Sequence, residues 1–145
     1  MKHLFSTALA LVMASFAGFA QCDADHIVEA SSFMYAPSSL TIEQGESVAF
    51  INLGGTHDVN GDVDSQTGMS FGNPEAFYLD AVSGAPEGEC IGTYTFNVPG
   101  TYNYDCSIGT HAALGMVASI VVNPAPMTTT VVDVIAGSPD HTLLA

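Results

Sequence analysis

The stretch YDCSIGTHAALGM, residues 104–116, decides how this chain is interpreted. It places Cys106, His111 and Met116 at steps of five residues, between two segments rich in β-forming residues. A loop of that size allows a thiol, an imidazole and a thioether to converge on one point. This convergence, rather than any single residue, indicates that the three side chains form one site.

A fourth side chain must come from elsewhere, and His57 in GGTHDV, residues 54–59, is the candidate. It follows an apolar, β-prone segment and a glycine pair that lets the chain turn. One thiolate, two imidazoles and a thioether suit copper, because sulfur favours Cu(I) and imidazole tolerates Cu(II). Zinc sites more often contain further Cys or His and no Met. The sequence therefore predicts one copper ion bound by His57, Cys106, His111 and Met116.

Each of these residues also has an ordinary structural explanation when it is taken alone. His57 could be a hydrogen-bonded turn residue, Cys106 a buried thiol or half of a disulfide, and Met116 a core residue at the start of a strand. The four together, in a chain with only 5 His, favour a metal site.

Short strands separated by turns are expected around this loop. The predicted strands are 26–30, 39–43, 47–52, 93–98, 101–105 and 117–122. Residues 61–92 break the alternation and are expected to form a long irregular excursion, with a short helix at 73–77 capped by Asn73. Several short strands without a strong amphipathic helix predict an all-β fold, a Greek-key β-sandwich.

Residues 26–122 resemble a cupredoxin of the plastocyanin and pseudoazurin kind. The resemblance rests on FNVPGTY at 96–102, which leads into YDC at 104–106, and on the three candidate ligands His57, His111 and Met116. It implies an eight-stranded Greek-key sandwich with type 1, or blue, copper at one end. It also implies that the protein transfers single electrons between redox partners and is not an enzyme.

Two departures from the family pattern bear on the expected redox potential. The step from Cys106 to His111 is longer than in plastocyanin, and Asp58 stands where many members have Asn or Ser. A carboxylate beside the metal is expected to favour Cu(II) and to lower the potential. Asp105 and backbone amides near Ser107 are expected to complete the surroundings of the metal.

The path of the electron is expected to run through His111. Small apolar residues flank this imidazole and are expected to form a contact patch around it: Ala112, Ala113 and Leu114. A second route is expected from Cys106 along its strand through Tyr104.

Three other functions remain open at this level. A multicopper oxidase or nitrite reductase shares such a site but needs a further centre, and the mature chain has only His26 and His141 to spare. Copper storage or delivery usually uses open sites rich in Met or Cys. A copper-binding module of a larger cell-surface adhesion protein is supported only by the C-terminal tail.

Residues 1–20 are interpreted as a cleaved signal peptide, with Lys2 before an apolar run and small residues at Gly18 and Ala20. A membrane anchor is the alternative, but the run is short and lacks a charged stop. Lipid attachment at Cys22 is disfavoured by the bulky Gln21 before it. The protein is therefore expected to be secreted, periplasmic or at the cell surface, with no membrane span in the mature chain.

The charge of the chain is strongly acidic. The sequence has 15 acidic residues and one basic residue, Lys2, so removal of the signal changes the net charge from −14 to −15. Such a chain is not expected to bind nucleic acid or an anionic membrane. A basic redox partner, such as a c-type cytochrome, would be attracted to it, although selection for solubility explains the charge equally well.

Three cysteines are an odd count for an oxidising compartment. The natural division is a Cys22–Cys90 disulfide that leaves Cys106 as a thiol, although sequence alone does not show that the two are close. The domain is expected at 21–123, a linker at 124–130 and a tail at 131–145. The tail resembles the opening of a fasciclin domain, with a disordered tail as the alternative, so the protein is expected to be a monomer or part of a longer multidomain chain.

Overall fold

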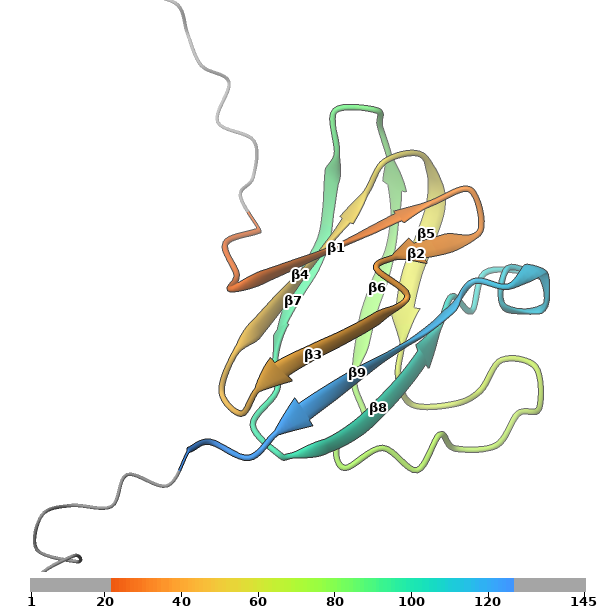
Figure 1. The fold of residues 1–145 in the computed structure, drawn as a ribbon. Helices are drawn as coiled ribbons and strands as arrows, with labels where there is room; N and C mark the ends of the chain where they lie inside the picture. Colours follow the sequence, from red (N-terminus) through yellow and green to blue (C-terminus); the bar gives the residue numbers. More distant parts are fainter. Residues whose placement is uncertain (1–21, 127–145) are drawn as a thin grey trace, which may run out of the picture.

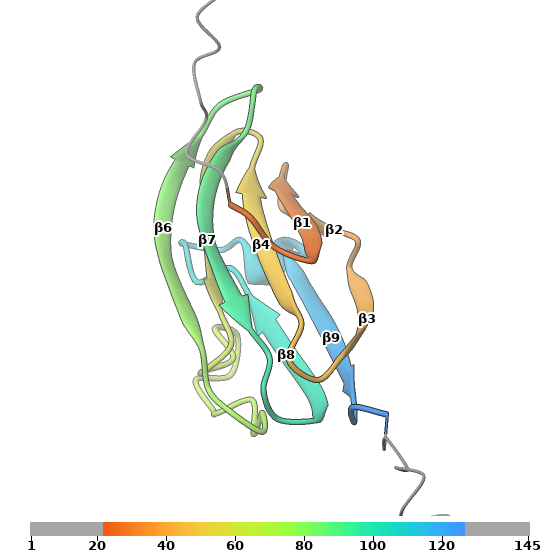
Figure 2. The same cartoon turned by 90° about the vertical axis from the view of Figure 1, so that its left-hand side faces the viewer.

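Two β-sheets packed face to face form the computed structural model, which describes residues 22–126 (Figures 1 and 2). One sheet has the strand order β2-β1-β4-β7 and the other β3-β9-β8-β5-β6. The elements of the first sheet are β1 (His26–Ser31), β2 (Met34–Ala36), β4 (Ser47–Asn52) and β7 (Glu89–Thr95). Those of the second sheet are β3 (Ser39–Glu43), β5 (Gly55–Asn60), β6 (Tyr78–Gly84), β8 (Gly100–Asp105) and β9 (Val117–Asn123). The predicted all-β sandwich is confirmed.

Both sheets are mixed, because β1 pairs in parallel with β4 and β3 pairs in parallel with β9, whereas the other pairs are antiparallel. The chain crosses from the first sheet to the second between β2 and β3. Along β1 the side chains alternate as a half-buried strand requires, with Val28 and Ala30 buried and Ile27 exposed. The alternation fixes which face of each sheet packs against the other.

The predicted strands 39–43 and 47–52 agree with β3 and β4 residue for residue, and those at 26–30, 101–105 and 117–122 each gain one residue. The prediction for 93–98 is displaced, because β7 ends at Thr95 and Phe96 turns to bond with Gly45 and Glu46. The predicted irregular excursion over 61–92 is wrong beyond Phe77, since it contains β6 and the start of β7. The sequence signal is weak there because β6 is an edge strand, hydrogen-bonded within its sheet only to β5 and with mostly exposed side chains.

The predicted helix at 73–77 does not form. The Asn73 side chain does not cap a helix: its Nδ2 donates to the carbonyls of Gly61 (2.8 Å) and Asn103 (2.7 Å), and its Oδ1 accepts from the Asn103 N–H at 2.8 Å. Four residues later, the buried Phe77 ring enters the core while its carbonyl accepts from the Gly61 N–H at 2.8 Å. Tertiary contacts at both ends of the segment therefore override the local helix signal.

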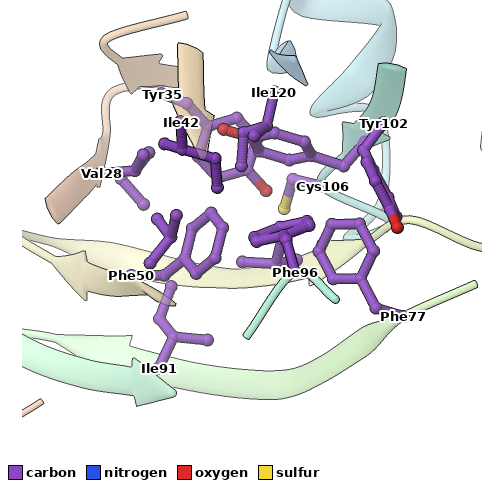
Figure 3. Packing of buried hydrophobic residues seen from close by; sticks show 14 of the residues in the cluster. Val28, Tyr35, Ile42, Phe50, Phe77, Ile91, Phe96, Tyr102, Cys106 and Ile120 are labelled. Atoms are coloured by element: carbon purple, nitrogen blue, oxygen red, sulfur yellow. The ribbon is translucent and has the colours of Figure 1, made fainter. Parts of the chain in front are cut away.

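An aromatic cluster fills the space between the sheets (Figure 3). Phe96 packs edge to face against Tyr102 at 4.9 Å and against Phe77 at 5.4 Å between ring centroids. The Cys106 side chain lies in the same cluster (Figure 3). The thiol therefore sits in apolar surroundings at the end of β8.

A disulfide joins Cys22 to Cys90, with their Cα atoms 5.8 Å apart, and ties the segment before β1 to β7. Cys106 is left as a buried free thiol, so the division of the three cysteines expected from the sequence is the one observed. No helix within residues 22–126 has the length and apolar character needed to cross a membrane. The signal segment 1–20, linker residues 127–130 and the tail 131–145 lie outside the described residues.

Candidate metal centre

Three of the four predicted ligands meet at one end of the sandwich. The Sγ of Cys106 lies 3.3 Å from Nδ1 of His111 and 3.8 Å from Nδ1 of His57. One donor atom from each of the three residues lies within 4.8 Å of the others. The structure places His57 inside β5, a strand not predicted from the sequence, and Cys106 directly after β8.

The spacing of these atoms fits a metal ion. Two donors that each lie about 2.0–2.3 Å from a common ion in a trigonal plane are about 3.7 Å apart. The separations of 3.3 and 3.8 Å between sulfur and nitrogen bracket that value. A thiolate with two imidazoles in a plane is the donor set of a copper site whose fourth ligand is a distant thioether.

The Met116 side chain is fully buried, and its backbone is fixed to the other two residues of the loop. The Cys106 N–H donates to the Met116 carbonyl at 3.1 Å, and the Met116 N–H donates to the His111 carbonyl at 3.0 Å. Between them the single helical turn η1 (Ala112–Leu114) ends at Gly115, which adopts the left-handed conformation with φ 106°. The loop thus folds back on itself and returns Met116 beside Cys106.

The position of His57 depends on Asn52, a buried residue that sequence analysis did not single out. The Asn52 Oδ1 accepts from the Gly54 N–H at 3.0 Å, while its Nδ2 donates to the carbonyls of Gly55 (3.2 Å) and Val82 (2.7 Å). Gly55 has φ 83°, and a Cβ there would lie 3.1 Å from His57 Nε2. Glycine is required at 55 both by the backbone conformation and by the close imidazole.

Four consecutive residues of β5, from His57 to Asn60, are buried, although a strand normally alternates. At the bulge between β5 and β6, Asp80 and Ala81 lie opposite the single residue Asp58. His57 and Val59 face the core, and the two polar residues of the other face are covered by hydrogen-bonding partners. This explains how a carboxylate directly after a candidate ligand is excluded from solvent.

The Asp58 carboxylate accepts three hydrogen bonds. Its Oδ1 accepts from the Ser107 N–H at 2.7 Å, and its Oδ2 accepts from the Ser107 hydroxyl and from the Tyr78 hydroxyl, the latter at 2.9 Å. The Asp58 carbonyl accepts from the Tyr35 hydroxyl at 2.6 Å. Asp58 therefore links the strand of His57 to the residue that follows Cys106.

Asp105 has a different role from the one expected. Its carboxylate accepts from the Ser65 N–H (2.7 Å), the Ser65 hydroxyl (2.8 Å) and Asn60 Nδ2 (3.0 Å), so it fixes the 61–77 loop over β5 and β8. Burial raises the pKa of Asp105, and the hydrogen bonds from Ser65 and Asn60 act in the opposite direction. Because neighbouring residues of a strand point to opposite faces, this carboxylate faces the loop while Cys106 faces the core.

Burial also shifts the proton affinities of the candidate ligands. It raises the pKa of the Cys106 thiol to about 11, although backbone amides of Asp58 and Ile108 act to lower it. It lowers the pKa of His57, and the nearby His111 lowers it further. Both shifts favour the uncharged forms of the side chains. A metal ion would therefore bind a neutral His57 imidazole and would replace the proton of the Cys106 thiol.

Of the two candidate histidine ligands, His111 is partly exposed and His57 is buried. The ring of Phe33 packs edge to face on His111 with centroids 4.8 Å apart, and Phe33 is 45% exposed. Ser32 and Phe33 both have left-handed φ values, 44° and 61°, which are strained for residues other than glycine. Phe33 was not predicted from the sequence, because its contact with His111 arises from the turn between β1 and β2.

The expected contact patch is confirmed only in part. Leu114 is 60% exposed and Ala113 is also exposed, but Ala112 is buried. A cavity of about 320 Å³ opens next to the two imidazoles, and no charged residue lines it. Tyr104, on the expected second route, is only 1% exposed and packs against Tyr35, so its side chain offers no direct contact to a partner.

A β-sandwich with a thiol, two imidazoles and a buried thioether at one end has the architecture of a cupredoxin. The model of the plastocyanin/azurin family of copper-binding proteins matches residues 22–123. The chain therefore belongs to this family of copper-binding, electron-transfer proteins. No curated protein sequence is significantly similar to it.

One of the similar solved structures superposes well enough to support the fold. The reduced Cu(I) form, at pH 4, of a mutant of amicyanin is 21% identical and superposes with a TM-score of 0.52, over 72% of this chain and 87% of the other. Amicyanin from Paracoccus versutus (Thiobacillus versutus) is 22% identical, with a TM-score of 0.48 over 71% and 84% of the two chains. Auracyanin B is 20% identical, with a TM-score of 0.49 over 74% and 96%.

Proposed function

We propose that this chain is a secreted type 1 copper protein that carries single electrons, with His57, Cys106, His111 and Met116 as the metal ligands. The observation that supports it best is the spacing of the Cys106 sulfur and the two Nδ1 atoms, 3.3 and 3.8 Å, in a family that binds copper. Copper supplies a one-electron couple between Cu(I) and Cu(II). A carrier needs a site that serves both states with little rearrangement.

The surrounding chain provides that rigidity. Cys106, His111 and Met116 belong to one loop closed by backbone hydrogen bonds, and Asn52 fixes the turn that leads to His57. None of these interactions needs the metal. The donors are therefore held ready in the protein, which keeps the cost of changing oxidation state small.

The proposed point of electron exchange is the edge of His111. Phe33 and Leu114 extend an uncharged surface around this imidazole, and the cavity beside it is lined without any carboxylate. The 15 acidic residues of the chain would steer a basic redox protein, such as a c-type cytochrome, before apolar contact at this end. Added salt should then slow the association.

Secretion is proposed on two grounds. The first 20 residues have the pattern of a signal peptide, and the Cys22–Cys90 disulfide is typical of an oxidising compartment. Copper delivery is the less favoured role, because the Cys106 and Met116 side chains are buried and an open exchange site would expose them.

The test is the absorption spectrum of the purified apo-protein after addition of one equivalent of Cu(II). An intense band in the orange-red is expected from a copper–thiolate bond, and Cys106→Ser should abolish it. Met116→Leu should shift the spectrum and the redox potential, whereas the exposed Met69→Leu, as a matched control, should leave both unchanged. A colourless complex in the wild-type protein would contradict the proposal.

A further inference from the structure

Tyr78, the first residue of β6, has no place in the function proposed above. The residue is 50% exposed, yet its hydroxyl donates to the buried Asp58 carboxylate, at 2.9 Å from Oδ2. A phenol on an edge strand could bond to water instead. Tyr78 pairs with Asn60 of the neighbouring strand β5. Asn60 lies two residues from Asp58, on the same face of the sheet, and this register brings the Tyr78 side chain beside Asp58.

The hydrogen bonds from Tyr78 lead to the metal centre in two short steps. Asp58 follows His57 in β5, and its carboxylate accepts both the N–H and the hydroxyl of Ser107, the residue after Cys106. The two segments that carry buried candidate ligands are thus joined through one carboxylate. Tyr78 is the third donor to that carboxylate and the only one of the three that belongs to neither ligand segment.

We propose that Tyr78 is a positioning residue of the metal centre: its hydroxyl fixes the Asp58 carboxylate against Ser107 and withdraws part of its negative charge from the metal. The part of this inference that concerns redox potential rests on the proposed function. The part that concerns the position of Ser107 does not, because every contact in it exists in the protein without copper.

The charge argument follows from burial. Asp58 is fully buried, so its charge is compensated by hydrogen-bond donors and not by solvent. Ser107 supplies two donors, one to each carboxylate oxygen, and Tyr78 supplies the third, to Oδ2. Without the phenol, more of the negative charge acts on the metal, and a more negative environment stabilises Cu(II) relative to Cu(I).

The test compares Tyr78→Phe with Tyr102→Phe. Each variant loses one hydroxyl whose hydrogen bond is 2.9 Å long; the Tyr102 bond goes to the Val98 carbonyl, outside the metal centre. Both changes keep the aromatic ring and its packing. The pair therefore separates loss of a hydrogen bond in general from loss of this particular one.

In the apo-protein, amide hydrogen exchange at Ser107 is measured against the core amide of Ile120. Tyr78→Phe is expected to speed exchange at Ser107 by about tenfold and to leave Ile120 unchanged, since a hydrogen bond to a charged group is lost beside it. Tyr102→Phe should not selectively change the exchange rate at Ser107 or at Ile120. Equal exchange at Ser107 in Tyr78→Phe and wild type would overturn the positioning role.

In the copper-loaded protein, the Cu(II)/Cu(I) ratio is measured at a fixed applied potential. Tyr78→Phe is expected to raise this ratio by about threefold, as a fraction of a unit charge acts over several ångströms, and Tyr102→Phe should not change it. An unchanged ratio in Tyr78→Phe would overturn the electrostatic part. If the wild-type protein formed no coloured copper complex, the proposed function would fail, while the exchange measurement would still decide the positioning role.

Discussion

Copper binding by the apo-protein should be controlled by a single proton, that of Cys106. Burial raises the pKa of this thiol to about 11, so at pH 7 nearly every molecule carries the proton. A metal can bind the sulfur only by displacing it. About four pH units separate neutrality from that pKa, which corresponds to roughly 5 kcal/mol of binding free energy spent on deprotonation at 1.36 kcal/mol per unit.

The direction and steepness of the change in copper affinity with pH follow from these pKa shifts. The pKa of His57 is lowered by burial and by His111, so His57 is already neutral at pH 7 and releases no proton. Between pH 7 and 9 the affinity should therefore rise about tenfold for each pH unit, one proton being released per ion bound. The trend should level off as the pH approaches the pKa of the thiol.

The assay is anaerobic competition with a chromophoric Cu(I) chelator at pH 7, 8 and 9, corrected for the chelator's own proton binding. Met116→Leu should lower the affinity and keep the slope, because a thioether carries no proton. Cys106→Ser should remove the dependence of the affinity on pH. A wild-type affinity that does not change with pH would refute the reasoning, since it would mean that the thiol is already ionised in the folded apo-protein.

Three further predictions concern stability and tuning. Replacing Cys22 and Cys90 together by Ala opens a link across 68 residues and should cost about 4 kcal/mol of unfolding free energy, measured by urea denaturation under oxidising conditions. Phe77→Ala should cost about 3–5 kcal/mol and make the 61–77 loop more sensitive to proteolysis, because this buried ring anchors it. Asp58→Asn should raise the redox potential in voltammetry, as a buried negative charge is removed while an acceptor oxygen remains; an unchanged potential would mean that the carboxylate does not act on the metal.

The fold was predictable where local pattern and tertiary environment agree. Strands β3 and β4 alternate or are β-branched, and their predicted bounds match. β5 was missed because it opens with Gly55 and carries buried polar residues whose partners come from distant parts of the chain. The helix at 73–77 failed for the converse reason: Asn73 is a good cap locally, but its amide binds Gly61 and Asn103.

The candidate site was predictable as a set of residue types but not as an assembly. Three of its members lie in one loop, so their spacing is visible in the sequence, and His57, which follows a glycine pair upstream, completes the set. Phe33 and Tyr78 were not predictable. Phe33 contacts His111 because of a strained turn, and Tyr78 contacts Asp58 because of the register between two strands. Neither contact produces a periodic pattern in the sequence.

The direction of two strands has a practical consequence for electrochemistry. β1 runs toward the metal end and stops shortly before Phe33, whereas β9 starts directly after Met116 and runs away from that end (Figure 1). A linker attached beyond Asn123 would therefore anchor the molecule to an electrode with the imidazole of His111 facing the solution. Diffusing partners would retain free access to it, while a film anchored through the loop at 111–116 would hide it.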